Sequence, residues 1–136
     1  MRNNKKQFLI LAVILFSRCS FAENQTVFYD PQLVQLAGVI ETKTFPGAPN
    51  YENIKDGDAA ETSLYLILDH PVNVSPAAET NELVNIPEKN VRVIQLVDVR
   101  RSAWNKLHDG EHVFVRGMLF HKLNGHHHSR VLMMVK

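Results

Sequence analysis

The segment that most limits how this chain can fold is residues 1–22, because it holds the only cysteine. Basic residues near the start precede an unbroken apolar run over residues 8–16, and small side chains follow at Ser20 and Ala22. This is the pattern of a secretory signal peptide, and the run is well short of the roughly 18 residues that a membrane-spanning helix needs. We therefore expect cleavage before Glu23, with no membrane span in the mature chain.

Loss of the leader removes Cys19, so the mature domain would enter an oxidising compartment without a disulfide and depend on a packed core. Residues 23–136 suffice for one domain with such a core, but not for two. The leader also contains several of the 15 Lys and Arg residues, whereas all 14 Asp and Glu residues lie beyond it, so the mature chain is acidic. An acidic chain without a basic run disfavours nucleic acid as a partner.

Runs of β-branched and other apolar residues predict five strands, at residues 33–40, 63–69, 91–97, 112–121 and 127–135. Gly38 interrupts the first strand, as glycine does at a bulge or a barrel bend, and Pro71 is expected to end the second. Trp104 and Leu107, three residues apart, indicate a short helix over residues 99–107.

Five strands with a helix after the third is the element order of an OB-fold, a small Greek-key barrel. We therefore expect a mainly β chain with a single domain over residues 23–136: an OB-like five-stranded small barrel with one short helix between strands three and four. A plain antiparallel sandwich with an accessory helix is the alternative. Asn124 and Gly125 are typical of a two-residue type I′ hairpin turn, in which both residues take positive φ.

The two most unusual loops are expected to meet. In an OB-fold, the loop between strands one and two and the loop between strands four and five flank one ligand-binding face. These loops correspond here to residues 45–61 and 121–128. The candidate ligand-binding residues are therefore Phe45, Asn50, Tyr51 and Glu52, with the two aromatic rings as stacking platforms for a sugar ring or a peptide.

The same two stretches resemble a small exported bacterial domain family of unknown function. Residues 45–61 read FPGAPNYENIKDGDAAE, where the family carries FPGxPNYExIxxGDxxE, and residues 125–132 read GHHHSRVL, where it carries GHHHxxVL. The similarity extends over most of residues 33–135. It implies an exported single domain and no assigned activity.

The histidines suggest a metal site. With a two-residue turn, His121 would pair with His128, and His121, His126 and His128 would share one face of the last hairpin. Three imidazoles this close bind zinc, or copper with a fourth ligand, and Asp58 or Glu61 from the facing loop would complete the set. The alternative is that these histidines are solvated polar residues beside a turn.

Three functions are compatible with these patterns. The first is a periplasmic or secreted binding or interaction module, with an unknown ligand or protein partner held between the Tyr51 loop and the histidine hairpin. The second is a metal-binding protein or metal-dependent enzyme, and the third is a proteinaceous inhibitor or immunity-type partner. Glu52, Asp58 and Glu61 would also suit acid and base chemistry on a glycan. Because the mature chain has no nucleophile motif or phosphate-binding glycine loop, catalysis is not the first expectation.

Overall fold

The computed structural model describes residues 23–78, 84–98 and 104–136, so the expected signal peptide at residues 1–22 lies outside the described part. A strand content of 58% makes the chain mainly β, as predicted. The strands are β1 (Gln25–Phe28), β2 (Leu33–Pro46), β3 (Ala60–Ser75), β4 (Glu88–Val97), β5 (His112–His121) and β6 (Val131–Val135). Within the described residues, no helix has the length and apolar character that crossing a membrane requires.

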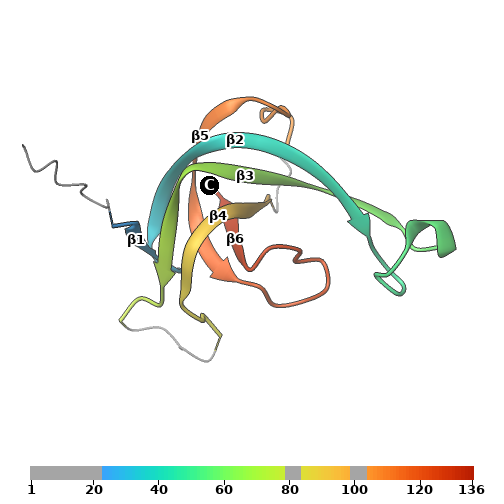
Figure 1. Ribbon diagram of the computed structural model, residues 1–136, viewed down its shortest axis with the longest axis horizontal. Helices are drawn as coiled ribbons and strands as arrows, with labels where there is room; N and C mark the ends of the chain where they lie inside the picture. The colour runs from blue at the N-terminus through green and yellow to red at the C-terminus, as the bar shows by residue number, and fades with distance from the viewer. Residues whose placement is uncertain (1–22, 79–83, 99–103) are drawn as a thin grey trace, which may run out of the picture.

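Five of these strands close into a barrel (Figure 1). β2 pairs antiparallel with both β3 and β5, β3 pairs antiparallel with β4, and β5 pairs antiparallel with β6. The ring closes because β4 pairs parallel with β6. This pairing confirms the OB-like barrel and shows that the sandwich alternative is wrong.

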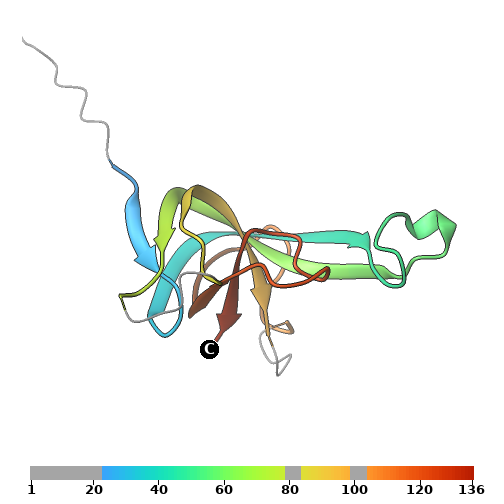
Figure 2. The ribbon, with the colours of Figure 1, turned by 90° about the horizontal axis from the view of Figure 1, so that it is seen from below.

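The core follows from the alternation along β3. Leu64, Leu66 and Leu68 are buried, and on β4 Ile94 and Leu96 meet them from the neighbouring strand. Side chains between these positions point out of the barrel, so the outer face of β3 and β4 can carry polar groups. Figure 2 shows β2 and β3 running on beyond the barrel as a long hairpin. Its loop carries the 3-10 turn η1 (Ile54–Asp56).

Several strand boundaries differ from the sequence prediction: β2 runs on to Pro46, β3 begins at Ala60 and β4 begins at Glu88. β1 was not expected, and it pairs parallel with the end of β3. Pro71 does not end β3, which continues to Ser75. The pairing with β2 stops at Leu68 and the pairing with β1 begins at Val72, so Pro71 lies where the ladder is interrupted. Its missing N–H therefore costs no ladder hydrogen bond there.

The predicted type I′ turn is wrong, because neither Asn124 nor Gly125 has a positive φ. β6 begins only at Val131, and His121 pairs with Val131 instead of His128. A nine-residue loop, residues 122–130, thus replaces the tight hairpin. Of the helix expected over residues 99–107, residues 99–103 lie outside the described part, and Trp104 begins a turn.

Gly38 sits where β2 passes from β3 to β5, pairing with Leu68 on one side and Val113 on the other. A Cβ at this position would overlap the backbone carbonyl oxygen of Ile67. We expect Gly38→Val to lower the free energy of unfolding by about 3 kcal/mol, since backbone cannot yield as a side chain does. Urea denaturation measures this change.

Gly125→Ala is the matched control, because its Cβ would make only ordinary contact with the Tyr51 ring at 3.5 Å. We expect it to change stability by less than about 0.5 kcal/mol. Equal effects of the two substitutions would contradict the assigned crossing at Gly38.

Candidate functional site

The loop between β5 and β6, here called the histidine loop (residues 122–130), is folded over the outer face of β4 by one side chain. The Gln95 Nε2 donates to the His126 carbonyl oxygen at 3.0 Å, and its Oε1 accepts from the His128 amide at 2.7 Å and the Ser129 amide at 3.3 Å. Gln95 is only 4% exposed. A side-chain amide has two donors and one acceptor oxygen, so it suits a loop whose backbone presents both kinds of group.

The histidine loop meets the loop at the end of the β2–β3 hairpin, here called the hairpin tip (residues 47–59). Tyr51 Oη lies 3.1 Å from His126 Nε2, and His126 Nδ1 lies 2.8 Å from Glu61 Oε1 at the start of β3. Because the Glu61 carboxylate only accepts, the Nδ1 of His126 carries the proton, which leaves Nε2 of the neutral ring to accept from Tyr51. The expected convergence of the two loops is confirmed.

Tyr51 reaches this junction from a strained backbone. Its φ of 60° lies in the left-handed region, which costs a bulky residue about 1–3 kcal/mol. The Tyr51 amide donates to the Gly47 carbonyl oxygen at 2.9 Å, and its ring meets that of His126 edge-on at 5.3 Å. Strain of this kind collects at ligand sites, where the surrounding contacts hold it in place.

Phe45 also contacts the histidine loop. Its ring stacks on His128 with centroids 4.3 Å apart and an interplanar angle of 9°. The His128 Nε2 is buried without a hydrogen-bond partner and lies 3.9 Å from Glu61 Oε2. Phe45 therefore holds the ring of His128 in place on the outer face.

Asp58 has a structural role in the hairpin tip. Its carboxylate accepts backbone N–H groups from Asn53 at 2.9 Å, Glu52 at 2.8 Å and Asn50 at 2.9 Å. These bonds, that of Asn53 foremost, hold the pKa of Asp58 below its ordinary value. Asn50 and Glu52, both predicted ligand-binding residues, are exposed and contribute backbone groups to this network.

The predicted metal ligands are not brought together. His121 Nε2 bonds Glu88 Oε1 at 3.0 Å instead of facing His128, and Asp58 is occupied by the hairpin tip. Only His126 and His128 approach Glu61. Over residues 23–78, 84–98 and 104–136, no group of three or more His, Cys, Asp or Glu residues is arranged to hold a metal ion. The expected set of zinc or copper ligands thus depended on a hairpin register in which His121 pairs with His128, and the chain does not adopt that register.

His127 contacts its own loop and Phe120 instead of the hairpin tip. Its Nδ1 accepts from the Leu123 amide at 3.0 Å, and its ring packs edge-on against Phe120. Burial lowers the pKa of His127, and the neighbouring His126, Lys122 and His128 add to the effect. The three consecutive histidines therefore have different contacts. His126 contacts the hairpin tip, His127 contacts its own loop, and His128 stacks on Phe45.

Beside the junction lies a hollow of about 740 Å³, here called the loop cleft. Its walls come from the start of β3, the end of β4, the turn at Trp104 and the histidine loop, and the lining side chains include Glu61, Ser63, Gln95, Asp98, Trp104, Asn105 and His126. Sequence reasoning missed Gln95, Ser63 and Asn105. A lone amide inside the apolar run of residues 91–97 was the one available signal for Gln95.

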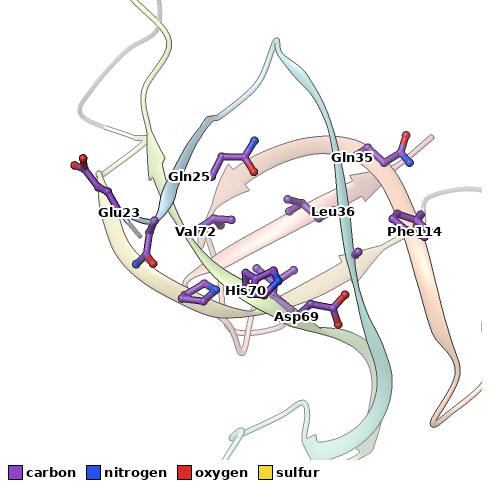
Figure 3. A pocket seen from close by; sticks show the side chains of 12 residues that line it. Glu23, Gln25, Gln35, Leu36, Asp69, His70, Val72 and Phe114 are labelled. Carbon is purple, nitrogen blue, oxygen red and sulfur yellow. The ribbon is translucent and has the colours of Figure 1, made fainter. Parts of the chain in front are cut away.

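A second hollow of about 730 Å³ opens between β1 and β2. Figure 3 shows Leu36 and Val72 near its centre, with Glu23 on one side and Phe114 on the other. Asp69 on its wall is already paired with His112 at 2.8 Å. Polar side chains such as Gln25, Gln35 and His70 line it as well. The loop cleft is the stronger candidate because the two loops that the sequence expected to converge meet beside it.

Residues 93–136 match the family model of a domain of unknown function (DUF4431). The match agrees with the resemblance to a small domain family of unknown function. The matched segment contains Gln95 and the whole histidine loop, so the contacts that fold the loop over β4 lie within it. Neither the curated proteins nor the solved structures include a significant match.

Acidification should loosen the hairpin tip. Because the folded pKa of Asp58 is lowered, its stabilising bonds are present above the ordinary value of 3.8 and are lost as the pH falls through the folded value. We expect the amide resonances of Asn50, Glu52 and Asn53 to shift together in an NMR titration below pH 3.8.

Asp58→Asn should remove this transition and speed amide exchange in the hairpin tip at neutral pH. Asp56→Asn is the control, since Asp56 accepts from the Asn53 side chain at 2.8 Å instead of from these amides. A transition that survives in Asp58→Asn would show that another carboxyl group causes it.

Proposed function

We propose that this chain is an exported binding module whose loop cleft holds a neutral saccharide. Export is supported by the leader pattern of residues 1–22. The observation that carries the binding proposal is the junction itself: two loops tied together by Tyr51, His126 and Glu61 beside a hollow of about 740 Å³. Hollows of roughly 300–1,000 Å³ are typical of small-ligand sites.

The lining of the loop cleft suits a sugar. Trp104 packs against the core and lines the cleft, so its indole supplies an apolar surface for the C–H face of a sugar ring. Ser63 and Asn105 add donors and acceptors for ring hydroxyls. An apolar platform with a few polar groups around it gives both contact area and orientation.

The charge of the cleft narrows the ligand class. Glu61 and Asp98 both line it. Carboxylates repel the phosphates of nucleic acid, in line with the acidic balance of the mature chain. They accept hydrogen bonds from hydroxyl groups, so a neutral polyhydroxylated ligand is favoured over a polyanion.

Two of the carboxylates that the sequence offered for acid and base chemistry are already engaged, which favours binding over hydrolysis by that pair. Asp58 is saturated by three backbone N–H groups, and Glu61 is engaged by His126. A glycosidase needs two carboxyl groups free to exchange protons with the bond that breaks. Asp58 and Glu61 do not meet that requirement here.

The chain's single tryptophan makes the test direct, because Trp104 lines the cleft. Addition of a tetramer of N-acetylglucosamine to tag-free protein should shift or quench its fluorescence in a saturable way. Asn105→Ala should weaken binding about fivefold, corresponding to the loss of about 1 kcal/mol from one hydrogen bond.

Gln35→Ala is the matched control, since Gln35 lines the hollow between β1 and β2. It should leave the affinity unchanged. Absence of any fluorescence change with this tetramer and with a panel of other neutral oligosaccharides, or equal losses in the two variants, would refute the saccharide assignment.

A further inference from the structure

A third hollow lies on the other side of the histidine loop, over the outer face of β2, β3 and β4. This basic hollow has a volume of about 400 Å³. Its lining side chains include Lys43, Tyr65, Arg92, His128 and Arg130, and no Asp or Glu lines it. It is therefore opposite in charge to the loop cleft, which Glu61 and Asp98 line.

Two side chains that line this hollow carry a buried polar atom without a hydrogen bond. Tyr65 Oη and His128 Nε2 are the buried side-chain nitrogen and oxygen atoms without a hydrogen bond in the part of the chain described. Tyr65 is only 2% exposed. Buried polar groups are nearly always hydrogen-bonded in folded proteins, and both side chains line this one hollow, so a ligand that enters it could supply the missing bonds. The Glu61 carboxylate lies 3.9 Å from His128 Nε2, beyond hydrogen-bond distance.

Tyr65 offers a hydroxyl donor, and His128 has a ring nitrogen that can donate. Burial raises the pKa of Tyr65 to about 12, so its hydroxyl keeps its proton at any physiological pH. Phe45 stacks on the His128 ring at 4.3 Å, and the Phe45 and Tyr65 rings lie 6.0 Å apart. A phenol hydroxyl donates one hydrogen bond, and an imidazole nitrogen donates one in the matching tautomer or when charged.

Cations surround these donors. Lys43 Nζ lies 5.4 Å from the centre of the Tyr65 ring and also contacts Glu41 at 3.3 Å. Arg92 is exposed on β4 and lines the hollow, and Arg130 pairs with Glu88 at 3.1 Å. Carboxylates and phosphates bind well where hydrogen-bond donors lie at the bottom of a hollow and guanidinium groups lie at its rim.

We propose that the basic hollow binds an anionic group, a carboxylate or a phosphate, with Tyr65 Oη and His128 Nε2 as buried donors and Arg92 as the rim cation. The site does not depend on saccharide binding, because the histidine loop separates it from the loop cleft and the two hollows share no lining residue. The mature chain has a net negative charge, which would repel an anionic ligand at long range. Contacts within the hollow would therefore select the ligand.

The test is an NMR titration of the tag-free protein with two probes at constant ionic strength, inorganic phosphate and benzoate. Saturable shifts at Val93, Ser129 and Tyr65 amides are expected with at least one probe. Phosphate alone would identify a phosphate site, and benzoate alone a carboxylate site with an apolar neighbour at Phe45. Absence of binding by both probes would overturn the proposal.

Tyr65→Phe removes one oxygen atom without changing the packing of the ring. It should weaken binding about tenfold while the free protein becomes no less stable, since the hydroxyl has no partner to lose. Arg92→Gln should weaken binding about fivefold. Unchanged affinity in Tyr65→Phe would overturn the proposal, because it would place the anion elsewhere.

Arg116→Gln is the matched control, as Arg116 is an exposed cation on β5 outside the hollow. It should leave the affinity unchanged, and a loss equal to that of Arg92→Gln would overturn the proposal in favour of general surface charge. Asn105→Ala changes the lining of the loop cleft and should leave anion binding intact. Failure of the saccharide site and failure of the anion site can thus be told apart.

Discussion

The shape of the outer face depends on the amide of Gln95. This side chain is almost fully buried, yet it is polar, and it bonds the backbone of the histidine loop at His126, His128 and Ser129. A buried side-chain amide without hydrogen-bond partners costs about 1–3 kcal/mol. The loop backbone therefore supplies the hydrogen bonds that Gln95 needs, and Gln95 in turn holds the loop on the barrel. Ser129 Oγ adds a bond to the Val93 carbonyl oxygen at 3.1 Å. The loop therefore lies on the barrel as part of its structure.

One loop crossing creates two chemically different hollows. On one side, the loop cleft is lined by Glu61 and Trp104 and borders the contact between His126 and Tyr51. On the other side, the basic hollow is lined by cations and by Tyr65 and His128, each of which has a buried polar atom without a hydrogen bond. A ligand in either hollow would contact the histidine loop, so movement of the loop would affect both.

The sequence was sufficient for the barrel because its signals are local. Alternation at Leu64, Leu66 and Leu68 sets which side of β3 faces the core, and the order of five strands, with a helix expected after the third, was enough to indicate an OB-like closure. Convergence of the loops carrying Tyr51 and His126 followed from that topology alone. β1 was missed because four residues, QTVF, give too short a pattern.

The register of the last hairpin could not be predicted, and the expected set of metal ligands depended on that register. Asn124 and Gly125 favour a tight turn locally, but the Asn124 side chain instead accepts from the His126 amide at 3.0 Å, and distant groups on β4 hold the rest of the loop. The sequence around Gln95 gives no indication that its side chain bonds His126, 31 residues away. Asp58 likewise reads as a candidate ligand, whereas its bonds to Asn50, Glu52 and Asn53 emerge only once the hairpin tip has folded. Hydrogen exchange at the His128 amide reports on whether Gln95 holds the histidine loop, because that amide donates to Gln95 Oε1 at 2.7 Å. Gln95→Ala should speed exchange of this amide at least tenfold while Leu119 inside the barrel stays protected; unchanged protection of His128 in that variant would show that the loop does not depend on Gln95.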